Sequence, residues 1–148
     1  MPLRRLIALC LAVLALAACG QEGPPTAGEL KDFATVCDKA NEGKRVALEG
    51  YLRFPDSFKG DLSVILRMYQ ASNFSGKPVG VQIRLGNQAN QVEKVTKQFT
   101  DKDLKVHMAD GQVAGFGTKV RVSGSVYFPL VGQEFQCALE NPLVEPAK

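Results

Sequence analysis

Two stretches of the chain follow nearly the same pattern. Each carries a glycine in the middle of a predicted β-strand, where glycine weakens the strand. Residues 43–55 read GKRVALEGYLRFP and residues 117–129 read GTKVRVSGSVYFP, with Gly, Val, Gly, Phe and Pro at matching places. A glycine inside a strand marks a bulge or a tight bend, as at the corner of a barrel. Proline ends each strand because it has no N–H to donate to the ladder. The two stretches therefore predict two long strands that bend around a small barrel.

Alternation of apolar and polar residues, interrupted by turn residues, predicts five strands in all. They span residues 44–54, 62–69, 78–85, 118–128 and 134–139. In a strand, every second side chain points to the same face. The side chains expected to face the core are Val46, Leu48, Leu52 and Phe54, then Leu62, Val64, Leu66 and Met68, then Val79, Val81, Ile83 and Leu85, then Val120, Val122, Val126 and Phe128, and finally Phe135, Cys137 and Leu139.

Two further segments, residues 29–41 and 87–99, have apolar residues at the spacing of an amphipathic helix. The first predicts a helix before the barrel, and the second predicts a helix between the third and fourth strands. The apolar stripes are Leu30, Phe33, Ala34 and Cys37 in the first segment, and Val92, Val95 and Phe99 in the second.

The beginning of the chain has the form of a signal peptide. Arg4 and Arg5 precede an unbroken apolar run, residues 6–18, of about thirteen residues, whereas a membrane-spanning helix needs about 20. We therefore expect residues 1–18 to be removed on export.

The end of this segment resembles the lipobox of bacterial lipoproteins. Residues 16–19 read LAAC, and the resemblance implies that Cys19 receives a diacylglyceryl group and becomes the first mature residue. A lipid of more than one chain anchors a protein stably. By resemblance to lipoprotein sorting in Gram-negative bacteria, Gly20 implies the outer membrane, facing the periplasm. The alternative is an ordinary signal peptide cleaved nearby, which leaves Cys19 free.

Residues 19–28 are rich in glycine and proline and are expected to form a flexible tether. Residues 29–148 then form one domain. Without Arg4 and Arg5, 16 basic residues face 15 acidic ones, so net charge gives no reason to expect a nucleic-acid partner.

Cys37 and Cys137 are the cysteines left in the domain, and export places them where disulfides persist. Both lie on apolar stripes that face the core, so we predict a structural disulfide between them. A bridge that closes a loop of about 100 residues stabilises the fold by about 4.7 kcal/mol in the chain-entropy model. The alternative is two free buried thiols.

The predicted order of elements resembles the OB-fold, a five-stranded Greek-key barrel with a helix between the third and fourth strands. The stretches GKRVALEGYL, DGQ and GTKVRVSGSV resemble bacterial OB-fold proteins of the tRNA-anticodon-binding-like type. Several of those proteins are exported lipoproteins with a helix before the barrel. The resemblance covers residues 29–142 and implies bent strands, without implying any chemistry.

OB-folds bind across the outer face of the second and third strands, between the loops that follow the first and fourth strands. Aromatic and guanidinium groups on this face could stack on a ligand and hold phosphates or carboxylates. The alternative is an ordinary solvated sheet face. The outward residues that form the expected binding face are Tyr51, Arg53, Arg67, Tyr69, Gln82 and Arg84.

No catalytic motif is recognisable in the sequence. His107 lies near Asp101, Asp103 and Asp110, but these carboxylates belong to a polar connection where such residues cap or turn the chain. One histidine with scattered acids is poor material for a metal site, and we expect neither metal nor cofactor. We therefore expect a non-catalytic binding or adaptor module, with an envelope protein or a glycan as its partner. The alternative is a structural or envelope-stress lipoprotein without a specific ligand.

Overall fold

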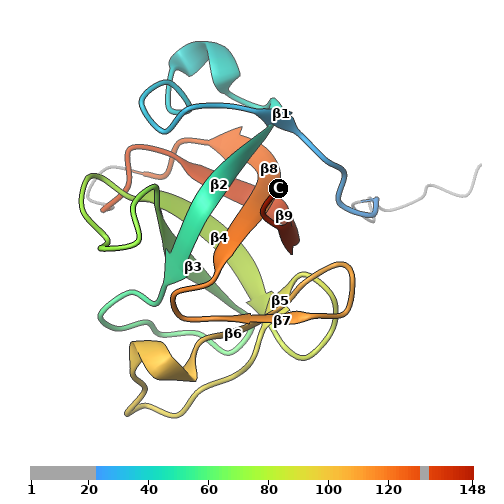
Figure 1. Cartoon of the computed structure of the whole chain (residues 1–148). Helices are drawn as coiled ribbons and strands as arrows, with labels where there is room; N and C mark the ends of the chain where they lie inside the picture. Colours follow the sequence, from blue (N-terminus) through green and yellow to red (C-terminus); the bar gives the residue numbers. More distant parts are fainter. Residues whose placement is uncertain (1–22, 131–133) are drawn as a thin grey trace, which may run out of the picture.

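A computed structural model of the chain describes residues 23–130 and 134–148 (Figure 1). In these two ranges the regular structure consists of strands and two short 3-10 helices, and no helix there is long and apolar enough to cross a membrane. The predicted signal peptide, Cys19 and the first residues of the predicted tether lie outside the described residues.

Five long strands close into a barrel, as the sequence predicted. β2 pairs antiparallel with both β3 and β8, β3 pairs with β4, and β8 pairs with β9. A parallel pairing between β4 and β9 completes the ring. This closed order, β2-β3-β4-β9-β8, is consistent with an OB-like Greek-key barrel. The strands are β2 (Arg45–Arg53), β3 (Ser63–Tyr69), β4 (Val79–Leu85), β8 (Lys119–Tyr127) and β9 (Ala138–Pro146).

One of the two glycines in the repeated pattern lies at an irregularity of its strand, which confirms that prediction for β8. Gly124 lies at a shift of register between β8 and β9, the sign of a β-bulge. A Cβ atom on it would lie 2.7 Å from the Cβ of Leu139. Gly50 pairs in regular register with β8 and directly precedes Tyr51, which pairs with both β8 and β3. β2 thus changes its partner from β8 to β3 next to Gly50.

The predicted N-terminal helix is wrong. Residues Glu29–Leu30 form β1, which runs parallel to β2 and occupies the edge that β3 leaves open. A single turn follows, in which the amide of Val36 donates to the carbonyl of Asp32 over 3.0 Å. The short 3-10 helix η1 (Lys39–Asn41) completes the segment.

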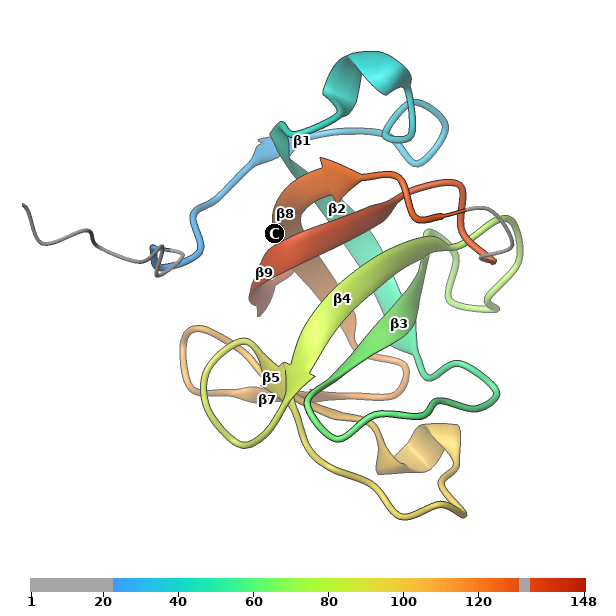
Figure 2. The same ribbon diagram turned by 180° about the vertical axis from the view of Figure 1, so that it is seen from behind.

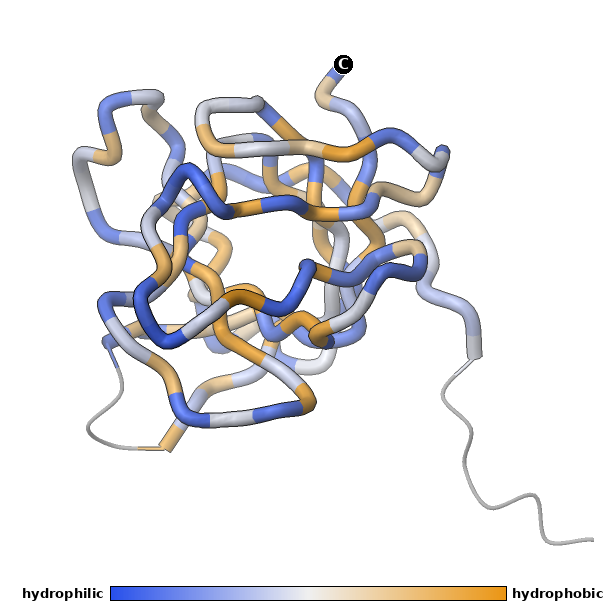
Figure 3. The backbone as a smooth tube through the Cα atoms, turned by 90° about the horizontal axis from the view of Figure 1, so that it is seen from below, coloured by the Kyte–Doolittle hydropathy of each residue, from blue (hydrophilic) through white to orange (hydrophobic). Residues whose placement is uncertain are grey.

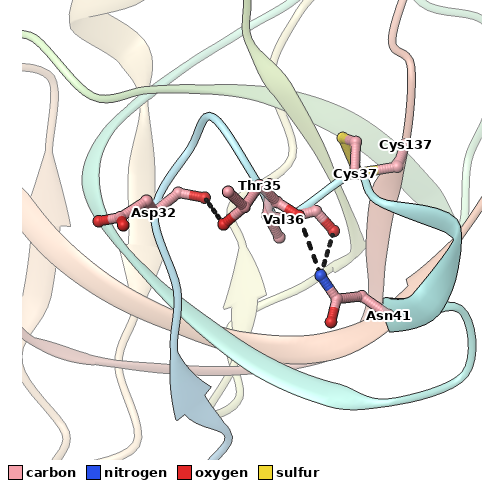
Figure 4. The surroundings of a disulfide bond; sticks show 6 residues. All are labelled: Asp32, Thr35, Val36, Cys37, Asn41 and Cys137. Atoms are coloured by element: carbon pink, nitrogen blue, oxygen red, sulfur yellow. Dashed lines mark hydrogen bonds between the residues drawn. A yellow bond between two sulfur atoms is a disulfide. The ribbon is translucent and has the colours of Figure 1, made fainter.

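Asn41 explains why this turn does not continue as a helix. Its side-chain amide donates to the carbonyls of Thr35 and Val36, over 3.0 and 3.2 Å, and these are the groups that a following helical turn would use (Figure 4). Val36 is fully buried, whereas Ala34, which the predicted stripe placed inside, is exposed. The segment therefore covers one end of the barrel with a turn, not a helix.

The predicted helix over residues 87–99 is also wrong. Its place is taken by short strands that lie across the other end of the barrel (Figures 1 and 2). Val92 is buried, as its stripe predicted, but it lies in a strand and pairs with Leu85 and Val106. Asn90 has a φ of 61°, which interrupts a right-handed helix. The elements here are β5 (Gln91–Val92), η2 (Asp101–Asp103), β6 (Lys105–His107) and β7 (Val113–Gly115).

The core fills the barrel and extends into both covered ends. Apolar residues alternate with polar ones along the strands, which Figure 3 shows as alternating colours on the backbone. The inward residues of β2, β3, β4 and β8 are buried as predicted, with Leu85 and Phe128 partly buried at the strand ends. Leu62 is the exception: it is 82% exposed because it lies in the loop before β3 begins at Ser63.

The last strand differs from its predicted bounds. β9 begins at Ala138 and runs to Pro146, so residues 134–137 are a connection and not a strand. Pro142 and Pro146 hid this strand from the sequence pattern, because proline weakens a strand assignment. Phe135 was predicted to face the core, but its ring lies on the outer face of the sheet, next to Gly80.

Candidate binding site on the outer face of the barrel

A pocket of about 360 Å³ lies on the outer face of β3 and β4. Ile65 and Gln82, which are opposite each other in the two strands, form its floor. The loop between β2 and β3 lines one side, and the connection that leads into β9 lines the other. The residues that line the pocket from these two segments are Pro55, Ser57, Phe58, Lys59, Glu134 and Phe135.

Gly80 on β4 makes room for this arrangement. A Cβ atom on Gly80 would lie 2.9 Å from both the Cβ of Ala138 and the Cγ2 of Ile65, and 3.1 Å from the ring of Phe135. Because Val79 and Val81 point into the core, this Cβ direction points outward. Phe135 therefore packs on the outer face of the sheet, where it is only 9% exposed.

Arg67 joins the two segments that flank the pocket. Its Nη1 donates to the carboxylate of Asp56 over 3.0 Å, and its Nε lies 2.7 Å from the carboxylate of Glu134. The contact with Glu134 is an ion pair whose geometry is not that of a hydrogen bond. The buried Nε therefore has no hydrogen-bond acceptor in the described part of the chain. The hydrogen bond from Arg67, and then its charge, lower the pKa of Asp56 below the usual range. The Arg67 side chain is only 11% exposed, and its two carboxylate contacts join the segments on either side of the pocket.

Three of the predicted site residues lie in a separate aromatic cluster. Tyr69 is 8% exposed and packs edge-on against the ring of Phe74, with 5.5 Å between ring centroids. Arg53 lies 5.5 Å from the same ring, and its Nε donates to Asp101 over 2.8 Å. Tyr51, half-buried, pairs with Tyr69 across the two strands. Phe116 stacks on Phe74 at 5.1 Å and completes the cluster.

The two outward residues of β4 are both exposed. Gln82 lines the pocket, and its Oε1 accepts a hydrogen bond of 2.9 Å from the hydroxyl of Tyr127. Burial, followed by the charge of Glu140, raises the pKa of Tyr127. Arg84 lies opposite Ser63, a lining residue, and has no ion pair within residues 23–130 and 134–148.

The pocket thus contains one of the six predicted residues, Gln82, with Arg67 and Arg84 next to it. Sequence reasoning missed Phe58, Lys59 and Phe135, which come from connections between strands. The predicted location, between the loops that follow the first and fourth barrel strands, was the signal that pointed to them.

The predicted disulfide is present, with Cys37 and Cys137 joined at a Cα–Cα distance of 5.4 Å (Figure 4). It ties the N-terminal turn to the residue before β9. A second pocket, of about 620 Å³, lies beside it and is lined by Phe33, Lys77, Val79 and Gln136. Glu134 lines this pocket as well as the first.

The acids near His107 are dispersed. Asp103 forms a capping box with Thr100, and the carboxylate of Asp110 accepts a hydrogen bond from the backbone amide of Gln112. Both contacts agree with the predicted roles of these acids in capping and turning the chain. Asp101 pairs with Arg53, as described above. The Nε2 of His107 lies 3.0 Å from the carboxylate of Glu93. Across the described ranges, no group of three or more His, Cys, Asp or Glu side chains could hold a metal ion.

No protein-family model matches this chain, and no curated protein or solved structure is similar enough to match it. The fold and the geometry of the site therefore rest on the residues of this chain alone.

Proposed function

We propose that this chain is a lipid-anchored protein of the cell envelope, and that its barrel, an OB-fold of the tRNA-anticodon-binding-like type, is a non-catalytic binding or adaptor module. The anchor is the lipid on Cys19, and the location is the outer membrane, facing the periplasm. The observation that carries the binding role is the pocket on β3 and β4 between the loops that follow β2 and β8. OB-folds bind their ligands in this place.

The composition of the pocket supports this proposal. Ligand sites are mostly apolar hollows with a few polar groups that fix the orientation of the ligand. Here Phe58, Ile65 and Phe135 supply the apolar surface, while Lys59, Gln82 and Glu134 supply exposed polar groups. A partner protein of the envelope fits such a surface.

The course of the N-terminal segment supports a site that faces away from the membrane. Arg45 donates to the carbonyl of Thr26, and Gly28 packs against the backbone of Val46, so the chain is held beside β2 from residue 26 onward. Figures 1 and 2 show this segment on one side of the barrel and the β2–β3 and β3–β4 loops on the opposite side. A tether of residues 19–25 has a mean reach of about 13–16 Å. The proposed anchor thus leaves the site accessible to envelope components on the side of the barrel away from the membrane.

Photo-cross-linking in cells tests the proposal. The cross-linking residue is placed at Lys59 and Gln82, both exposed in the pocket, and as a control at Lys119, exposed on β8. We expect one main species to be captured from the two pocket positions and not from the control. Equal and diffuse capture from all three positions would contradict a binding role and would favour a structural lipoprotein without a specific ligand.

A further inference from the structure

The two pockets meet at one side chain. Glu134 lines both of them, and its carboxylate lies 2.7 Å from the Nε of Arg67. The Glu134 side chain is 44% exposed, whereas that of Arg67 is 11% exposed. A nearly buried cation is therefore covered by a carboxylate that solvent can reach, at the boundary between two hollows.

The other charged groups along the two pockets are cations. Lys59 lines the first pocket and Lys77 the second, and neither has an ion pair among the residues that the structure describes. Asp56 keeps its hydrogen bond to the Nη1 of Arg67, so when Glu134 turns away it is the Nε of Arg67 that is left without a carboxylate. The two pockets then form one groove that presents this Nε together with Lys59 and Lys77. A groove with this charge pattern is complementary to an acidic ligand.

We propose that Arg67 is a carboxylate-binding subsite for an acidic peptide segment, which replaces Glu134 and occupies both pockets. The inference rests on the proposed binding role of the same face. Ile65 in the first pocket and Gln70 in the second are five residues apart along the chain, or about 17 Å in extended form. An extended peptide of five or six residues spans that length.

Side chains at alternate positions of an extended peptide point to the same side. The groove therefore fits an apolar residue, an acidic residue two positions later and a second apolar residue two positions after that. The first apolar side chain contacts Phe58 and Phe135, the acidic one contacts Arg67, and the second apolar side chain contacts Phe33 and Val79.

The aromatic rings favour a peptide over a glycan. A sugar stacks on an open ring face, but the ring of Phe58 packs on Phe54 and Phe99, at 6.0 and 5.3 Å between centroids. Phe135 is largely covered. Because both rings are engaged in packing within the protein, they are better suited to an apolar side chain than to stacking with a sugar.

The test measures fluorescence anisotropy of a dye-labelled peptide, Phe-Ala-Glu-Ala-Leu with capped ends, against the full-length protein in detergent. A matched peptide carries glutamine in place of glutamate. We expect the acidic peptide to bind about tenfold more tightly, because its carboxylate pairs with the guanidinium of Arg67 as charge with charge, whereas the glutamine amide is neutral. Glu134→Gln should tighten binding of the acidic peptide about fivefold, since it removes the competing carboxylate.

Glu145→Gln, the same change on β9, is the control and should leave both affinities unchanged. Equal binding of the two peptides, or no gain with Glu134→Gln, overturns the Arg67 subsite. Binding of an oligogalacturonate without binding of either peptide assigns the groove to a glycan and also overturns the proposal. Failure of all probes does the same, while capture in cells from Lys59 and Gln82 would still support the binding role of the face.

Discussion

The carbonyl oxygen of Tyr69 occupies the place where a Cβ atom on Gly50 would lie. The end of β3 can therefore lie this close to β2 only because residue 50 has no side chain. The pairing of β3 with β2 next to Gly50 is one link in the ring of strands that closes the barrel, and the candidate site lies on the outer face of β3.

Gly50→Ala should destabilise the protein by about 3 kcal/mol, at the upper end of the range for overpacking, because the group that must move is backbone. Gly115→Ala is the matched control, since its new Cβ would lie at a comfortable 3.6 Å from the carbonyl oxygen of Leu104. Urea unfolding measures both variants. Equal losses of unfolding free energy in the two variants would show that the carbonyl of Tyr69 does not lie in close contact with Gly50.

The Cys37–Cys137 disulfide closes a loop between residues 100 apart in sequence. Replacing both cysteines with alanine should lower the free energy of unfolding by about 2–5 kcal/mol, because the unfolded chain gains conformational freedom. A reducing agent should lower the stability of the native protein to that of the variant and leave the variant itself unchanged. A native protein that is insensitive to reduction would contradict a stabilising role for the bridge.

The carboxyl group of Asp56 should titrate below its usual range because of Arg67. Its pKa in the folded state is lowered from an unfolded value of about 3.9. Its contribution to stability is thus present above that value and is lost as the pH falls through the lower, folded-state pKa. An NMR titration of the carboxyl carbon measures this pKa directly.

Arg67→Met should raise the pKa of Asp56 toward its ordinary value, with the charge of Arg53 as the remaining cause of lowering, whereas Arg84→Met, the control on the next strand, should not change it. If Arg67→Met has no effect on the titration, the bridge between Asp56 and Arg67 is absent in solution. Such a result would also remove the reason for placing the β2–β3 loop against the pocket.

The strand pattern could be predicted from sequence because its signals are local. Alternation in β2, β3, β4 and β8 indicates which side chains are buried, and Gly124 indicates the bulge in β8. Both cysteines lay on apolar stripes, so their pairing followed without knowledge of the fold. What these signals share is that each is contained within a few neighbouring residues.

The helices were predicted wrongly because helical spacing of apolar residues has more than one cause. Val92, Val95 and Phe99 do pack against the core, but they reach it from a strand and a loop that cover the end of the barrel. The spacing indicates which side chains pack against the core, but it does not indicate whether a helix, a strand or a loop carries them. The positive φ of Asn90, an angle that asparagine adopts more readily than most residues, interrupts the helix that the spacing predicted.

The contacts of the candidate site had no local signal. The outward direction of Arg67 followed from alternation, but its partners Asp56 and Glu134 come from two different connections. Likewise, the alternation of residues 135, 137 and 139 placed Phe135 in the core, because nothing in the sequence indicates that β9 begins only at Ala138. The arrangement depends on where each loop packs, which only the folded chain decides.

The position of Phe135 on the outside of the sheet leads to a final prediction, tested by a double-mutant cycle with Gly80. Gly80→Ala places a methyl group against the ring of Phe135, against Ile65 and against Ala138, and should cost about 1–3 kcal/mol. In the Phe135→Ala background part of this cost should disappear, because the ring no longer has to move, with a coupling of about 0.5–3 kcal/mol. Val113→Ala on β7, at the far end of the barrel, is the control and should combine additively with Gly80→Ala. Additivity of the Gly80 and Phe135 substitutions as well would place the ring elsewhere and remove one wall of the proposed site.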